Sequence, residues 1–288
     1  MTARAVETRS SPASLRMPGV ASTAIRETLS DPHTLGTVLG TASHAVWLLV
    51  DGDVIVASTR DATRLPNGIE VAADSAADVF RTVRHGAPVT VGLGQLLFEG
   101  LTIDAVRWWD PRPALGRTSA PQIATAIVGL PATVPEIDSG PLAAALSTGS
   151  HQAILTASTS LIGRGPGLTP EGDDYLAGAL SAIRVLGEAL RDEDTAAMLD
   201  SLTDPLTRLA SAQTTTFSAA LIRHAIAGRV AAPAGSLLRS LTGRGDIANS
   251  LRELTHVGHT SGPALAAGMI LGARSLLQSQ SHSNGGNR

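Results

Sequence analysis

The spacing of apolar residues changes once along the chain, from short strand-like runs to helical stripes. Up to about residue 115 the apolar runs are short, rich in β-branched or aromatic residues, and separated by turns that contain glycine. The runs 45–50 and 53–58 flank Asp51 and Gly52, a pair that suits a tight hairpin. Further strands are expected at 88–92, 95–98 and 101–109. This pattern predicts a small antiparallel β-rich unit over residues 34–115.

From about residue 140 onward the apolar residues follow a helical period. Leu176, Leu180 and Ile183 recur at spacings of four and three, and similar stripes continue to Leu276. In the last stripe, Gly268 and Gly272 are expected to let a neighbouring backbone approach closely. The second half is therefore predicted to be a C-terminal α-helical bundle, which makes the fold class α+β.

Local composition marks the boundaries between these parts. The start of the chain mixes Ser, Thr, Arg and Pro without periodicity, several prolines follow the last expected strand, and the end is rich in Ser, Asn and Gly. The predicted segments are a flexible N-terminal segment at 1–33, the β-rich domain at 34–115, a connector at 116–140, the α-helical domain at 141–278 and a disordered tail at 279–288.

Composition excludes several classes of chemistry. All 22 basic residues are arginine and the chain has no cysteine, so lysine Schiff bases, Walker A loops, thiolates and disulfides are excluded. A net charge of -3 and an aromatic content of 2% argue against a nucleic-acid partner. No apolar run approaches the roughly 18 to 20 residues of a membrane span, and the first residues lack an apolar signal segment. We therefore expect a cytoplasmic protein with no membrane partner.

Glycine and polar residues are densest at 161–178, with the sequence LIGRGPGLTPEGDDYLAG. Its first glycines allow turns that direct several backbone N–H groups to one point, and Arg164 adds a guanidinium group. These glycines are Gly163, Gly165 and Gly167. Thr169 is expected to cap the helix that follows. The segment is therefore predicted to form an anion-binding loop at the start of a helix.

Two adjacent carboxylates, Asp173 and Asp174, fall in the first turns of this helix. At about 100° per residue, Asp173 lies at the edge of the apolar stripe and Asp174 lies on the face of Gly178 and Ser181. Each is a candidate catalytic residue. The alternative is a structural role, because carboxylates at a helix N-terminus gain about 0.3 to 1 kcal/mol from its dipole. Mg²⁺ shared with a phosphate, on these residues or Glu171, is a further possibility, and no other cofactor is expected.

A second polar segment, HVGHTSGP at 256–263, precedes the last helical stripe. Thr260 or Ser261 can cap that helix. His259 lies in a loop flanked by glycine, where an imidazole can act as an acid or base near neutral pH. We interpret His259 as a candidate catalytic residue, with a loop-bracing role as the alternative.

A third segment, TTTFSAALIRH at 214–224, carries hydroxyl groups on one helix face. Thr215 and Ser218 are three residues apart, which places them on neighbouring turns of that face. His224 falls on the buried stripe and is expected to be a hydrogen-bonded core histidine rather than a catalytic residue.

Three motifs together resemble the AllH-type family, named for a subunit of bacterial oxamate carbamoyltransferase. They are GRGPGLTPEGDDYLAG at 163–178, TTTFS at 214–218 and GHTSG at 258–262. The resemblance extends from about Gly36 to Gly272. It implies a role in purine or allantoin nitrogen recovery, where oxalurate and phosphate give oxamate and carbamoyl phosphate, and it implies companion transferase subunits as partners.

Both the candidate residues and the family resemblance indicate a site that holds two anionic substrates in position for nucleophilic attack. Arg164 would offset charge, Asp173 or Asp174 would hold the amide N–H groups of the substrate, and His259 would move a proton. The predicted ligand-binding residues are Gly163, Arg164, Gly165, Gly167, Thr169, Thr215, Ser218 and Ser261. The alternative function is a non-catalytic subunit that binds a small carboxylate or phosphate and scaffolds or regulates a partner enzyme.

Overall fold

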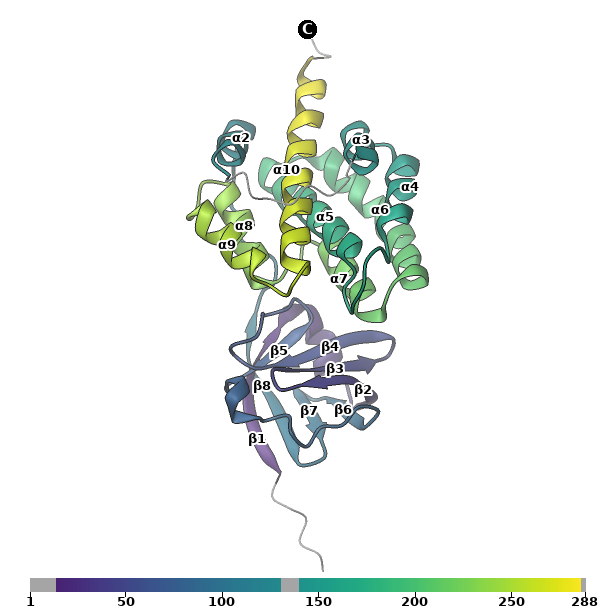
Figure 1. Ribbon diagram of the computed structural model, residues 1–288, viewed down its shortest axis with the longest axis vertical. Helices are drawn as coiled ribbons and strands as arrows, with labels where there is room; N and C mark the ends of the chain where they lie inside the picture. Colours follow the sequence, from purple (N-terminus) through teal and green to yellow (C-terminus); the bar gives the residue numbers. More distant parts are fainter. Residues whose placement is uncertain (1–13, 131–139, 286–288) are drawn as a thin grey trace, which may run out of the picture.

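The computed structural model describes residues 14–130 and 140–285, with side chains up to residue 280. It has two units stacked end to end, a β-barrel and a helical domain (Figure 1). Strand β1 (Leu15–Ser22) begins at the end of the barrel far from the helices, and helix α10 (Ser261–Gly285) runs up through the helical domain. Among the described residues, no helix combines the length and apolar character needed to cross a membrane.

The N-terminal unit is a closed barrel with the strand order β1-β5-β4-β3-β2-β6-β7-β8. After β1, its strands are β2 (Thr34–Ala42), β3 (Ala45–Val50), β4 (Asp53–Ser58), β5 (Gly68–Val71), β6 (Pro88–Gly92), β7 (Gln95–Phe98) and β8 (Leu101–Trp109). Short helical turns connect them: η1 (Thr23–Ile25), α1 (Arg26–Ser30) and η2 (Ser75–Ala77). All eight strands contribute to one buried cluster, so the barrel interior is a packed core.

The prediction of a small antiparallel unit is wrong, because β1 pairs in parallel with β8, β4 pairs in parallel with β5, and the sheet closes. Closure depends on β1, which lies inside the segment 1–33 that was expected to be flexible. Only the end of β1 is well buried, so its sequence lacks the alternation that predicts a strand. The hairpin at Asp51 and Gly52 is confirmed: these residues join β3 to β4 with φ values of 49° and 80°.

The second unit is helical, as predicted, and the class α+β is correct. Its helices are α2 (Ala120–Val128), α3 (Gly140–Thr148), α4 (His151–Leu161), α5 (Glu171–Leu190), α6 (Glu193–Gln213), α7 (Thr216–Ile226), α8 (Ala232–Leu241), α9 (Ile247–Thr255) and α10. The expected connector at 116–140 thus contains a helix, and its residues 131–139 lie outside the described part. The expected tail at 279–288 begins as helix, and residues 286–288 and 1–13 also lie outside it.

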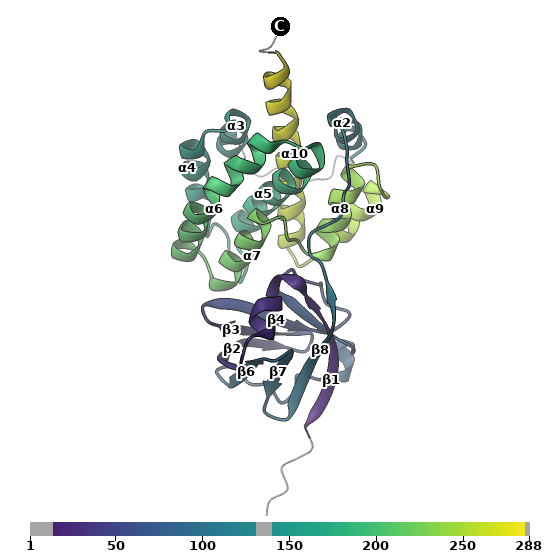
Figure 2. The same ribbon diagram turned by 180° about the vertical axis from the view of Figure 1, so that it is seen from behind.

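Helices α5 and α10 form the centre of this domain, with α3, α4 and α6 on one side and α2, α8 and α9 on the other (Figures 1 and 2). The two central backbones nearly touch. A Cβ atom at Gly268 would lie 1.9 Å from the carbonyl oxygen of Tyr175, and one at Gly272 would lie 2.4 Å from that of Ala179. The predicted close approach at these glycines is confirmed.

Helix α7 packs on the barrel and joins the two units. Its residues Phe217 and Ala220 share a buried cluster with Val54 and Val56 of β4. Beside this cluster, the guanidinium of Arg223 donates a hydrogen bond to the carboxylate of Asp53. The barrel therefore borders any cavity at this end of the helical domain.

Candidate functional site

Three helices, α5, α7 and α10, begin next to one another at the end of the helical domain that faces the barrel (Figure 1). The Thr169 hydroxyl, just before α5, lies 2.8 Å from the Ser261 hydroxyl at the first residue of α10. The Thr215 hydroxyl donates to the carbonyl oxygen of Leu168 at 2.7 Å and accepts from the Ser218 N–H at 3.0 Å, which caps α7. Helix N-termini present N–H groups and a positive dipole end, so this region favours anions.

Asp173 connects these helix starts. One of its carboxylate oxygens accepts a hydrogen bond from the Gly163 N–H at 2.7 Å, and the other accepts from the hydroxyls of Ser218, at 2.7 Å, and Thr214. Its side chain is buried, with 1% exposure. A buried carboxylate with three donors is fully satisfied, so Asp173 braces the glycine-rich loop and the start of α7 against α5.

Asp174 has the opposite environment. It is 7% exposed, and its Oδ2 atom is buried without a hydrogen-bond partner among the described residues. The pKa of Asp174 is raised to about 7, chiefly by burial; the charges of Asp173 and Glu171 contribute to the rise, and the hydroxyls of Ser261 and Thr169 oppose it. A carboxyl group that titrates near neutral pH can both give and accept a proton.

Asp174 lines a cavity of about 210 Å³ between the helical domain and the barrel. The barrel contributes Trp47 from β3 and residues of the loop after β4, and the helical domain contributes Thr169, Ser181 and Ser261 beside Asp174. The rest of the wall is mainly apolar and includes Leu65, Phe217, Leu221, Leu254 and Leu265. In such an apolar enclosure each polar contact to a ligand is stronger than it is in water.

The glycine-rich loop adopts the turns that its sequence predicts. Gly163, Gly165 and Gly167 have φ values of 77°, 115° and 96°, a region that other residues rarely adopt. The N–H groups of Gly165, Gly167 and Leu168 have no acceptor within the part of the chain that the structure describes. Arg164 is exposed, and its side chain has no partner in that part. The loop thus presents unpaired donors just before α5.

The structure divides the predicted site residues into three groups. Gly163, Thr215 and Ser218 belong to the bracing network around Asp173, and Thr214, which was not predicted, joins them. Thr169 and Ser261 lie at the cavity with Asp174. The exposed group comprises Arg164, Gly165, Gly167 and His259. His259, in the connection from α9 to α10, is not part of the cavity wall.

Sequence reasoning missed Trp47 and Arg229, which line the same cavity. No local motif identifies them, because β3 and the end of α7 come together only through packing of the two units. His224 is buried as predicted, but the expected hydrogen bonds are absent: both ring nitrogens are without a partner in the described structure. Burial lowers the pKa of His224 to about 4, so it is neutral at physiological pH.

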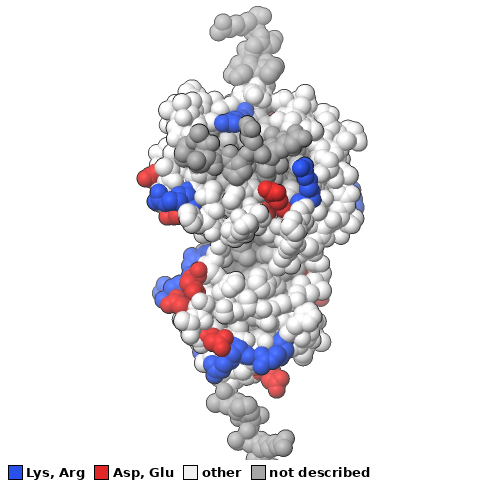
Figure 3. Space-filling view, viewed as in Figure 1, with Lys and Arg blue, Asp and Glu red and all other residues white. Residues whose placement is uncertain are grey.

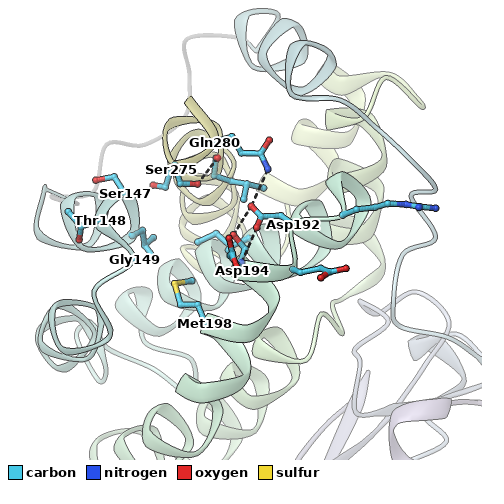
Figure 4. A pocket seen from close by; sticks show the side chains of 15 residues that line it. Ser147, Thr148, Gly149, Asp192, Asp194, Met198, Ser275 and Gln280 are labelled. Carbon is cyan, nitrogen blue, oxygen red and sulfur yellow. Dashed lines mark hydrogen bonds between the residues drawn. The ribbon is translucent and has the colours of Figure 1, made fainter. Parts of the chain in front are cut away.

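A metal centre and a second pocket are two further possible sites. Across residues 14–130 and 140–280, no cluster of three or more His, Asp or Glu side chains has the geometry to hold a metal ion. Glu171, Asp173 and Asp174 therefore do not form such a cluster. A larger pocket of about 750 Å³ lies at the start of α6, far from the barrel (Figure 4). Its Asp192 accepts hydrogen bonds from the N–H and the hydroxyl of Thr195 and from Gln280, so this carboxylate is already satisfied.

Charged side chains on the face shown in Figure 3 are few, and several of the arginines lie beside Asp or Glu. Several arginines near the domain junction are paired in this way. Arg64 binds Glu70, Arg184 binds Asp200, and Arg223 binds Asp53. These three arginines are therefore neutralised within the protein, whereas Arg164 and the cavity residue Arg229 have no carboxylate partner among the described residues.

Comparison with known families points to the same region. A family model described as oxamate carbamoyltransferase subunit AllH matches residues 161–273. The match confirms the resemblance seen in the motifs, although over a shorter stretch than was expected. It begins just before the glycine-rich loop and ends within α10, so it contains the starts of α5, α7 and α10 and excludes the barrel. Neither the curated proteins nor the solved structures contain a match to this chain.

Proposed function

We propose that this chain is a subunit of a carbamoyltransferase that converts oxalurate and phosphate into oxamate and carbamoyl phosphate. Its ligand site would be the Asp174 cavity together with the glycine-rich loop. One observation carries the proposal: the family match over 161–273 contains every helix start that surrounds Asp174. The stretch that is similar to the AllH family thus supplies the helix starts around Asp174, and the barrel supplies the rest of the cavity wall.

The chemistry requires one proton at a defined place. A phosphate oxygen attacks the ureido carbonyl carbon of oxalurate, a C–O bond forms, and the C–N bond to the oxamate part breaks. The departing amide nitrogen must take up a proton, and in the reverse direction it must lose one. Asp174 suits this step, because its pKa of about 7 keeps a large fraction protonated at neutral pH. Asp174 would therefore be the general acid, and in reverse the general base.

The second requirement is to hold an anion for attack. The unpaired N–H groups of Gly165, Gly167 and Leu168 precede the N-terminus of a 20-residue helix, an arrangement that suits phosphate. Arg164 would add a charge-assisted hydrogen bond from the exposed side of the loop. Asp173 would then act as a positioning residue, because it holds the loop through Gly163.

The subunit role fits the exposed position of two predicted site residues. Arg164 and His259 both lie at the surface near the helix starts, where a companion subunit could cover them and exclude water. His259 would act in that interface on the phosphate side, and not at Asp174. The isolated chain would therefore bind ligand but lack the complete catalytic environment.

The test is an assay of carbamoyl phosphate formation from oxalurate and phosphate, with the purified chain alone and with co-encoded companion subunits. We expect activity only in the assembly, and a loss of about 10² or more in turnover for Asp174→Asn. Asp204→Asn, an exposed carboxylate on α6, is the matched control and should retain full activity. Addition of EDTA to the same assay tests whether phosphate requires Mg²⁺.

Three results would overturn parts of this proposal. Wild-type turnover by the Asp174→Asn assembly would remove Asp174 as the acid. Assembly activity that does not depend on this chain, although the chain binds oxamate, would make it a non-catalytic binding subunit. Absence of both binding and turnover with oxalurate in the complete assembly would reject the carbamoyltransferase function.

A further inference from the structure

Two residues that line the cavity, Trp47 and Arg229, carry nitrogen donors without a partner among the described residues. The Nε1–H group of Trp47 is buried and lacks an acceptor among the described residues. Its ring is held edge-to-face against Phe217, with ring centroids 6.3 Å apart, so the donor has a fixed direction. Buried N–H groups are nearly always paired, and one in a cavity wall points to an acceptor that a ligand brings.

Arg229, in the connection that follows α7, is the second donor. It lines the same cavity, and its side chain forms no ion pair or hydrogen bond with any described residue. This differs from Arg64 and Arg223 at the same domain junction, which are paired with carboxylates. Burial is the main cause of the lowered pKa of His224, and the charge of Arg229 adds to it. An unpaired guanidinium beside an apolar cavity favours an anion, and its planar fork matches a carboxylate.

The charges of the cavity favour a ligand with two different ends. Asp174 and Arg229 are the ionisable residues among those that line it, and they do not pair with each other. The Asp174 carboxyl group offers an acceptor to a ligand N–H, whereas Trp47 and Arg229 offer donors to ligand oxygens. Between them the wall is apolar and includes Phe217 and Leu221, which suits the flat faces of a small planar molecule.

We propose that Trp47 and Arg229 form a carboxylate subsite, so that the cavity binds a small amido acid with its carboxylate on these two residues and its amide N–H on Asp174. The inference rests on the proposed function and specifies which end of the substrate each residue holds. It also gives the barrel, which lies outside the family match, a direct role in choosing the substrate through Trp47.

The experiment compares binding of oxamate with binding of oxamide, by calorimetry with the full chain and with its assembly. Oxamide has nearly the same shape but carries an amide in place of the carboxylate. We expect the wild-type chain to bind oxamate at least about tenfold more tightly than oxamide. Arg229→Gln should abolish most of this preference, and Trp47→Phe, which keeps a ring but loses the N–H, should lower it severalfold.

The chain offers a matched control for Trp47. The Nε1 atom of Trp109 on β8 is also buried and unpaired, but Trp109 does not line the cavity. Trp109→Phe should therefore leave the preference for oxamate unchanged. If Arg229→Gln fails to fold, Arg229→Lys gives the readout, because it keeps the charge but loses the planar fork, and the preference should fall severalfold.

The outcomes separate this inference from the function on which it rests. An unchanged preference in both Trp47→Phe and Arg229→Gln, with binding lost in Asp174→Asn, would overturn the carboxylate subsite and leave the proposed function standing. Equal binding of oxamate and oxamide by the wild-type chain would also overturn the subsite. Absence of binding to either compound by chain and assembly would overturn both.

Discussion

Asp173 and Asp174 are neighbours in the first turn of the same helix, yet the protein uses them in opposite ways. Both are buried. Asp173 points into the junction of the glycine-rich loop and α7, where three donors surround it, whereas Asp174 points to the cavity, where its Oδ2 atom has no donor in the described structure. The rotation of about 100° per residue along an α-helix is enough to direct the two side chains to different surroundings. One step along the helix therefore separates a carboxylate that is fully hydrogen-bonded from one whose pKa is raised by burial.

The largest effect expected from this contrast is on the pH dependence of stability. The pKa of Asp174 rises from 3.8 to about 7 on folding. The folded state therefore binds this proton more tightly, so the associated stability is complete below pH 4 and is lost as the pH rises through 7. The loss amounts to roughly 4 kcal/mol of unfolding free energy. Urea unfolding of the wild-type chain and of Asp174→Asn at pH 4, 6 and 8 measures it.

In that comparison the asparagine variant should gain stability relative to the wild-type chain as the pH increases. Asp204→Asn, at an exposed position, is the control and should follow the wild-type curve. Parallel pH curves for the wild-type chain and Asp174→Asn would show that the carboxyl group is solvated in solution.

The second effect concerns Asp173. Asp173→Ala leaves the Gly163 N–H and the hydroxyls of Thr214 and Ser218 without their acceptor in a buried place. We expect the unfolding free energy to fall by about 3 kcal/mol at pH 7, because unsatisfied buried donors are costly. Urea unfolding measures this, with Asp204→Ala as the control. A loss below about 0.5 kcal/mol would mean that water replaces the carboxylate and that Asp173 is no brace.

The sequence predicted the helical half of the molecule better than the barrel, for a physical reason. The apolar stripes of α5 and α10 and the glycines at their contact are local signals of helix and close packing, and Gly268 and Gly272 lie where they were expected. Barrel closure depends on pairing of β1 with β8, far apart in sequence. Neither the partner of a strand nor the parallel direction can be seen in its own residues.

The candidate site shows the same division. The residues of the glycine-rich loop, the two aspartates and Thr215 lie in short local motifs, so the sequence identified them. The predicted cap at Thr169 is wrong: Pro170 is the N-cap of α5 and makes no side-chain cap hydrogen bond, and the Thr169 hydroxyl pairs with that of Ser261 instead. Trp47 and Arg229 reach the cavity through packing of the barrel against α7, which local patterns do not encode. His259, which the sequence suggested through its residue type and its glycine-flanked loop, lies at the surface before α10 and outside the cavity wall.

The third effect compares two serines, one on each side of the start of α5. Ser218 donates to Asp173 at 2.7 Å, whereas Ser261 lies at the cavity beside Asp174. Ser218→Ala should lower the unfolding free energy by about 1.5 to 2 kcal/mol, because it removes a charge-assisted hydrogen bond in a buried place. Urea unfolding at pH 7 measures the loss. A neutral effect would indicate that Thr214 and Gly163 alone hold the carboxylate.

The smallest effect on stability is expected from Ser261→Ala, and this variant tests the difference between Asp173 and Asp174 most directly. The Ser261 hydroxyl opposes the rise in the pKa of Asp174, and it pairs with Thr169, which can form a hydrogen bond with water instead. We expect a change in unfolding free energy below about 0.5 kcal/mol at pH 5, where Asp174 is protonated. The pKa of Asp174 should move upward, because the charged form loses a donor while burial is unchanged.

NMR titration of the Asp174 carboxyl carbon in the wild-type chain and in Ser261→Ala measures this shift, with Ser218→Ala as the control that leaves it in place. A downward shift in Ser261→Ala would mean that water enters the cavity when the hydroxyl is removed, and the raised pKa would then depend on packing at the start of α10 rather than on the apolar wall.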